Sequence, residues 1–150
     1  MTRVLFVCTG NTCRSPMAAG ILRQLSAGRI DAVSAGLAAV SGARASPEAA
    51  QVMAERGVDL TDHRARPFSR ELAEAADLVI TMTAAQKDLV LAWEPGLRGK
   101  VRTLAEAAGR GGEVSDPYGG DLEAYRRCAA ELAQAVGGLV RRLGEEEERP

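Results

Sequence analysis

The sequence predicts a single-domain α/β protein whose mainly parallel sheet is covered by helices on both faces. Short apolar runs alternate with segments whose apolar residues recur at helical spacing, which is typical of βαβ units with right-handed crossovers. A chain of 150 residues fits one domain and buries a core without a metal or disulfide framework. A polar, glycine-containing loop follows the first apolar run, where such sheets place their ligand sites.

Residues 4–7 read Val-Leu-Phe-Val, an apolar run that predicts a strand buried on both faces of the sheet. We expect a helix from Pro16, because proline suits a first turn and apolar residues follow at helical spacing to Leu25. Residues 30–35 are the second strand candidate, which ends at Gly36.

The next segment predicts helices on either side of an irregular stretch. Ser46 caps a helix that begins with Pro47 and ends near Gly57. Residues 59–67 are charged and irregular, and residues 72–76 indicate a short helix.

Two further strands are expected around one helix. Residues 78–80 predict a buried strand, and residues 101–104 are the fourth strand candidate. Between them, residues 84–92 predict an amphipathic helix with Leu89 and Val90 on its apolar face.

A glycine-rich loop at residues 109–120 precedes the C-terminal segment. From Leu122 to Leu143, apolar residues at helical spacing predict a long terminal helix, which two adjacent glycines weaken without ending. We place the domain at residues 1–144 and expect residues 145–150 to form a charged, frayed tail.

The composition narrows the classes of function. Lys and Arg total 19 against 20 Asp and Glu, so no overall basic field exists to attract nucleic acid or anionic lipid. Three cysteines are too few for a secreted disulfide framework, and no N-terminal apolar run is long enough for a signal peptide or membrane span. We expect a cytoplasmic protein with no nucleic-acid or membrane partner, and we favour a monomer.

The loop after the first strand carries the candidate chemistry, and it reads Cys8-Thr9-Gly10-Asn11-Thr12-Cys13-Arg14-Ser15-Pro16. Because it leads into a helix N-terminus, free backbone N–H groups and the positive helix end favour a bound anion. The same field favours the thiolate of Cys8, and the forked donors of Arg14 match phosphoryl oxygens. The loop is therefore a candidate phosphate-binding nucleophile loop.

Other interpretations of this loop explain less of it. A buried structural cysteine beside a surface arginine would not require the strand, the helix and the turn residues together. A Walker-type nucleotide loop needs Gly-Lys-Ser or Gly-Lys-Thr, which the chain lacks. A dinucleotide fingerprint needs several glycines, and only Gly10 lies in this turn.

With cysteine, five residues, arginine and then serine near the N-terminus, the chain resembles the low-molecular-weight protein tyrosine phosphatase family. Asp116-Pro117-Tyr118 matches the family's Asp-Pro-aromatic motif, which carries the general acid. Ser34-Ala35-Gly36 and His63 also fall at matching positions. Taken alone, Asp116 would be interpreted as a turn residue and His63 as a core histidine.

The resemblance implies a three-layer sandwich with a four-stranded, mainly parallel sheet, and a phosphatase of phosphorylated proteins that needs no metal or cofactor. It implies that the catalytic residues are Cys8, Arg14 and Asp116. It assigns phosphate or substrate binding to Thr9, Gly10, Asn11, Thr12, Cys13, Ser15 and Tyr118. It also implies that Ser34 and His63 join Asn11 and Ser15 in hydrogen bonds that hold the loop, with the Ser15 hydroxyl stabilising the Cys8 thiolate.

Residues near the loop bear on the substrate. Tyrosine-specific members usually carry Leu or Met after the nucleophile, Ile at the position of Thr12, and often a second aromatic residue after Asp-Pro-Tyr. This chain instead has Thr9, Thr12 and Gly119-Gly120. This pattern resembles the protein arginine phosphatase branch, and a hydroxyl suits a guanidinium better than it suits an apolar ring. Tyr118 also occurs in tyrosine-specific members, so protein tyrosine phosphatase activity stays an alternative.

Two other activities fit less well. Thioredoxin-linked arsenate reductases share the loop but need extra cysteines after the third strand, and residues 82–89 contain none. We expect Cys128 to be a small buried apolar residue. A non-catalytic phospho-residue binding module would lack the nucleophile or the acid, and both are present. The sequence does not decide whether Cys8 and Cys13 form a regulatory disulfide.

Overall fold

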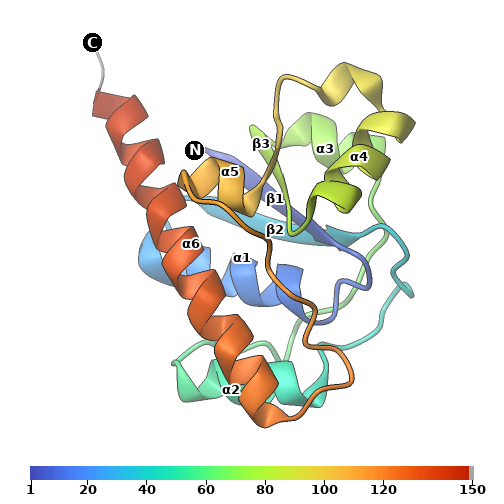
Figure 1. Ribbon diagram of the computed structural model, residues 1–150, viewed down its shortest axis with the longest axis vertical. Coiled ribbons are helices and arrows are strands. Elements are labelled where there is room, and N and C mark those ends of the chain that lie inside the picture. Colours follow the sequence, from blue (N-terminus) through green and yellow to red (C-terminus); the bar gives the residue numbers. More distant parts are fainter. Residues whose placement is uncertain (149–150) are drawn as a thin grey trace.

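Four parallel strands form the central sheet, in the spatial order β2-β1-β3-β4 (Figure 1). The computed structural model describes residues 1–148. The strands are β1 (Arg3–Cys8), β2 (Asp31–Gly36), β3 (Leu78–Thr81) and β4 (Val101–Thr103). All four predicted strands are present, and β1 lies between β2 and β3, so its C-terminal end opens at the middle of one sheet edge.

Helices cover both faces of the sheet, which gives the predicted three-layer sandwich (Figure 1). The helices are α1 (Arg14–Leu25), α2 (Pro47–Glu55), α3 (Arg70–Ala75), α4 (Ala84–Trp93), the 3-10 turn η1 (Pro95–Leu97), α5 (Leu104–Ala108) and α6 (Leu122–Glu148). Figure 1 shows α6 crossing in front of α1, with α2 beside the N-terminal end of α6 and α3 and α4 on the opposite side of the sheet.

The side chains of β1 point alternately to the two faces of the sheet, so this strand contributes to two separate hydrophobic cores. Val4 and Phe6 point into a larger core that includes residues of α1, α2, α5 and α6. Leu5 and Val7 point into a smaller core under α3, α4 and η1. Because both faces of β1 are buried, its sequence is a continuous apolar run, as predicted.

Helix α1 begins at Arg14, so Pro16 lies in its first turn, as predicted. Two other predicted details are wrong. Leu104 does not extend the fourth strand but begins α5, whose start is fixed by a capping box between Thr103 and Glu106. Leu89 is 46% exposed, so the apolar face of α4 contains Val90 without Leu89.

The C-terminal helix is continuous and passes the two adjacent glycines. A Cβ atom at Gly138 would lie 3.1 Å from the Ala108 carbonyl oxygen, so this glycine allows α5 to pack against α6. Residues 145–148 are helical rather than frayed, because glutamate is a good helix former in continuation of an existing helix. The domain boundary at residue 144 stays a prediction, and residues 149–150 of the predicted tail lie outside the described residues.

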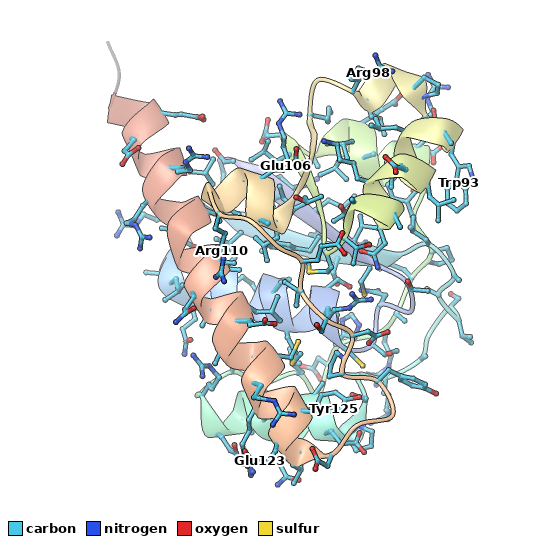
Figure 2. All side chains as sticks on the ribbon, in the orientation of Figure 1. Trp93, Arg98, Glu106, Arg110, Glu123 and Tyr125 are labelled. Atoms are coloured by element: carbon cyan, nitrogen blue, oxygen red, sulfur yellow. The ribbon has the colours of Figure 1, made fainter. Side chains whose placement is uncertain are left out.

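The outer surface of α4 carries Trp93, which projects away from the sheet (Figure 2) and is half exposed. Within residues 1–148, no helix combines the length and the apolar character that crossing a membrane requires.

Candidate active site

The site is built where β1 passes into α1. Cys8 is the last residue of β1 and Arg14 is the first of α1, so residues 9–13 form a tight loop at the C-terminal edge of the sheet. Asn11 has a φ of 57°, a left-handed conformation that asparagine tolerates better than most residues. A Cβ atom at Gly36 would lie 2.7 Å from the Thr9 carbonyl oxygen, so glycine is required for the loop to rest on β2.

The side chain of Asn11 is the centre of the hydrogen bonds that hold this loop. It is fully buried, and its Nδ2 donates to Ser15 Oγ at 2.8 Å and to Ser34 Oγ at 2.9 Å. Its Oδ1 accepts a hydrogen bond from the backbone N–H of Arg66 at 3.0 Å. The structure therefore brings Asn11, Ser15 and Ser34 together as the resemblance implied, and it adds Arg66.

His63 braces the same loop from the segment that follows α2. Its Nε2 lies 2.7 Å from the Asn11 carbonyl oxygen, so the ring donates a hydrogen bond there from Nε2. Burial lowers the pKa of His63, and the hydrogen bond to Asn11 opposes that change by raising it. The neutral ring already supplies the required donor, so bracing the loop does not require a charged histidine.

The thiol of Cys8 is buried at the floor of the loop, where Ser15 contacts it. Cys8 Sγ and Ser15 Oγ are 2.9 Å apart. Ser15 Oγ already accepts from Asn11 Nδ2, which leaves its own proton free to donate to the sulfur. This arrangement fits the predicted role of Ser15 in stabilising a Cys8 thiolate, because a hydrogen bond to the charged form favours that form.

Arg14 connects the loop to the segment between α5 and α6, which passes the start of α1 (Figure 1). The side chain is 5% exposed, and its Nη1 donates to the Val114 carbonyl oxygen at 3.0 Å. Its Nη2 lies 3.6 Å from Asp116 Oδ2. Asp116 and Cys8 therefore face the same space although they are far apart in the sequence.

That space is a cavity of about 370 Å³. Its walls contain Cys8, Thr9, Gly10, Thr12, Cys13, Arg14, Ala38, Val40, Ala43, Asp116 and Tyr118. All three predicted catalytic residues line it, whereas Asn11, Ser15, Ser34 and His63 lie behind the loop as supports. The sequence reasoning missed the small apolar wall from residues 38–43, which gives no motif beyond its position after the second strand.

Cys13 has a second environment behind the loop. Tyr125, at the first turns of α6 (Figure 2), places its hydroxyl 3.4 Å from Cys13 Sγ. Burial raises the pKa of Tyr125 to about 12. Cys13 Sγ in turn donates to Ser46 Oγ at 3.5 Å, and both Cys8 and Cys13 are free thiols.

The third thiol is buried as expected. Cys128 lies on α6, and burial raises its pKa to about 12, so it is an inert thiol. Within residues 1–148, no group of three or more His, Cys, Asp or Glu side chains has the arrangement of a metal site.

This geometry defines a class of site. A buried cysteine lies at a helix N-terminus, a buried arginine closes the loop, and an exposed carboxylate faces both across a small cavity. Such a site can hold a phosphoryl group against a nucleophile with an acid opposite.

Comparison with known proteins identifies the family. The low molecular weight phosphotyrosine protein phosphatase family matches residues 3–149. The chain belongs to this family of cysteine-based phosphatases.

Three relatives illustrate how closely it matches. The protein-arginine-phosphatase of Geobacillus stearothermophilus is 38% identical over 97% of this chain and 98% of its own. The structure of the YwlE arginine phosphatase from that organism has a TM-score of 0.93 and covers 100% of this chain and 99% of its own. EpsP of Ralstonia solanacearum, a probable low molecular weight protein-tyrosine-phosphatase, is 39% identical over 93% of this chain and 94% of its own.

A further solved structure is that of a YwlE arginine phosphatase variant in which serine replaces a cysteine and the active-site serine is phosphorylated. It is 35% identical, with a TM-score of 0.91, and covers 95% of this chain and 96% of its own. The fold and the enzyme class predicted from the sequence are confirmed.

Proposed function

We propose that this phosphatase removes the phosphoryl group from phosphoarginine in proteins through a thiophosphate on Cys8. Cys8 Sγ attacks phosphorus in line, and the P–N bond to the guanidinium breaks. The loop N–H groups and Arg14 hold the three equatorial oxygens, where charge develops. Asp116 gives its proton to the departing nitrogen, so arginine leaves directly as its guanidinium cation and Asp116 becomes a carboxylate.

The second step returns the enzyme to its starting state. Asp116, now a carboxylate, takes a proton from water, and the water oxygen attacks phosphorus. The S–P bond breaks, the sulfur leaves as the thiolate that Ser15 stabilises, and inorganic phosphate departs. The phosphorylated active-site serine of the YwlE variant supports a phosphoryl group carried on the nucleophile position.

The observation that carries the choice of substrate is Thr12. Its side chain lines the cavity. At this position, the tyrosine-specific members of the family usually carry isoleucine. A hydroxyl in this wall is able to pair with the N–H groups of a guanidinium, whereas an isoleucine would leave them unpaired. Gly119 leaves open space beyond Tyr118, so no second aromatic wall is available to stack on a phenol.

Protein phosphotyrosine is the alternative substrate. EpsP, of similar identity, is named as a probable protein-tyrosine-phosphatase, and Tyr118 lines the cavity with an exposed ring. Under either alternative, the partners are phosphorylated proteins and Cys8 carries the phosphoryl group.

Side-by-side turnover of matched phosphoarginine and phosphotyrosine peptides tests the proposal. We expect a higher kcat/KM for phosphoarginine, and we expect Thr12→Ile to change the ratio of the two values by roughly tenfold to a hundredfold towards phosphotyrosine. Thr12→Ser keeps the hydroxyl and is the matched control, which we expect to preserve the preference. A wild-type preference for phosphotyrosine, or a ratio that Thr12→Ile leaves unchanged, would favour the tyrosine alternative.

The covalent step has its own test. Mass spectrometry of enzyme quenched during turnover should find phosphate on Cys8. Phosphate on His63 in place of Cys8 would contradict the mechanism.

A further inference from the structure

Gln86, in the first turn of α4, is a buried polar residue that no sequence motif singled out. It is 5% exposed, and α4 follows β3, the strand that lies next to β1 in the sheet. Its Nε2 donates a hydrogen bond to Thr9 Oγ1 at 3.2 Å, between residues that are 77 positions apart. Thr9 follows Cys8 and lines the same cavity.

The orientation of the Gln86 amide is determined by the backbone around it. Its Oε1 accepts hydrogen bonds from the N–H of Met82 at 2.9 Å and of Thr83 at 3.2 Å. The Thr83 hydroxyl in turn accepts from the Gln86 N–H, which completes a capping box at the start of α4. Rotating the amide by 180° would turn its NH₂ towards two backbone donors, so Nε2 has to face Thr9.

The hydrogen bond from Gln86 restricts the direction in which the Thr9 hydroxyl can donate its own proton. Thr9 Oγ1 uses a lone pair to accept from Gln86, so the Thr9 proton points away from the amide. Thr9 also lines the cavity that contains Cys8 and Arg14, so this proton is available to a ligand bound there. A hydroxyl that already accepts a hydrogen bond is a stronger donor, because chains of hydrogen bonds polarise one another.

We propose that Gln86 is a positioning residue that holds the Thr9 hydroxyl as a hydrogen-bond donor towards the phosphoryl group in the cavity. The proposal rests on the proposed function for the identity of that ligand. The capping box of α4 thereby contributes to anion binding, although Gln86 does not line the cavity.

Binding of inorganic phosphate, measured by calorimetry, tests this without requiring turnover. Gln86→Glu keeps an acceptor for the backbone N–H groups of residues 82 and 83 but replaces the donor that faces Thr9 with an oxygen. That oxygen takes the Thr9 proton and turns the hydroxyl away from the anion. We expect the Kd for phosphate to rise about tenfold.

A double-mutant cycle with Thr9→Val separates the hydroxyl from the added negative charge. In the Thr9→Val background, Gln86→Glu should raise the Kd by about threefold or less, because only the charge effect remains. Gln51→Glu, an exposed glutamine-to-glutamate change on α2, is the matched control and should leave the Kd unchanged. Equal effects of Gln86→Glu in both Thr9 backgrounds would overturn the proposal.

The pH dependence adds a readout that a purely structural role would not produce. When the introduced carboxyl is protonated at low pH, its O–H can donate to Thr9 as the amide does. The Kd of Gln86→Glu relative to wild type should therefore fall towards one as pH falls, and by more with Thr9 than with Thr9→Val. A relative Kd whose pH dependence is the same in both backgrounds would count against the proposal.

Two simpler variants test the proposal if Gln86→Glu does not fold, as judged by its thermal transition. Thr9→Val should weaken phosphate binding, and Thr9→Ser should restore it. Unchanged phosphate binding by Thr9→Val would overturn the role of the hydroxyl. A wild type that binds phosphate with this dependence but hydrolyses no phosphopeptide would contradict the proposed function and leave the Gln86 inference standing.

Discussion

The loop that holds Cys8 and the segment that holds Asp116 meet at one cavity but are constructed differently. In the nucleophile loop, Asn11, Ser15 and Arg14 are buried, and their side chains have hydrogen-bond partners from three other parts of the chain. In the acid segment, residues 109–121, the Asp116 side chain is 51% exposed and its Oδ1 accepts a hydrogen bond from the Tyr118 N–H at 3.1 Å.

The difference matches what each chemical role requires. An anion is bound well by donors that are already in place, because no free energy is then spent on orienting them. A general acid has to reach leaving groups of different shapes, and an exposed segment adjusts more easily than a buried one. The segment is nevertheless tied at its first half, where Val114 accepts from Arg14 and Glu113 accepts from the Ala84 N–H at 2.5 Å.

The largest expected effect comes from removing the nucleophile. Cys8→Ser should lower turnover of an aryl phosphate by about ten-thousandfold or more, since a serine hydroxyl is far less ionised than a thiol. Phosphate binding should change little, because the loop N–H groups and Arg14 remain. Initial rates and calorimetry measure the two effects separately. Cys128→Ser, at a thiol outside the cavity, is the matched control, and near wild-type turnover by Cys8→Ser would contradict the mechanism.

The acid segment gives the next largest effect. Asp116→Asn removes the proton donor with little change in shape, so the single-turnover rate should fall by roughly a hundredfold to ten-thousandfold. The free energy of unfolding should change by less than about 0.5 kcal/mol, because the side chain is exposed. The rate loss should be smallest for phenols that leave readily without a proton. Asp121→Asn, on the same segment, is the control that should retain activity, and equal losses for all leaving groups would exclude Asp116 as the acid.

The free energy of unfolding should depend much more on the nucleophile loop than on the acid segment. Asn11→Ala removes three hydrogen bonds and leaves buried partners unpaired, so the free energy of unfolding should fall by about 2–4 kcal/mol. Tyr118→Ala, at a residue that is 76% exposed in the acid segment, should change it by about 0.5 kcal/mol or less. Urea unfolding of both variants measures the difference. Similar losses in the two would show that the loops are equally constrained.

The sequence was most informative where local pattern and structure coincide. The apolar run of β1 predicted a doubly buried strand, and the loop between Cys8 and Ser15 predicted an anion site, because strand end and helix start are adjacent in the chain. Helix α5 escaped prediction because five residues are too short to show a helical period.

Long-range partners left no comparable signal. Gln86 and Arg66 bond to loop residues that are 77 and 55 positions away, and neither belongs to a recognisable motif. The prediction that Leu89 lies on the apolar face of α4 failed for a related reason. In a ten-residue helix with adjacent apolar residues, the sequence does not show which of them faces the sheet. Spacing along the chain predicts contacts only within an element or at its ends.

The smallest expected effect concerns His63 and the pH dependence of the brace on the nucleophile loop. Burial lowers the pKa of His63 in the folded chain, so the unfolded chain binds the proton more readily. Stability from the neutral ring is therefore fully present above the ordinary histidine pKa of about 6.5, and it is lost as pH falls through that value towards the lower folded pKa. His63→Gln keeps an N–H donor for the Asn11 carbonyl oxygen but does not titrate, so it should lose less thermal stability than wild type between pH 8 and pH 5. Thermal midpoints at both pH values measure this difference, with Tyr118→Ala as a variant that should follow wild type. An equal loss in His63→Gln and wild type would mean that His63 does not contribute to the acid sensitivity of the loop.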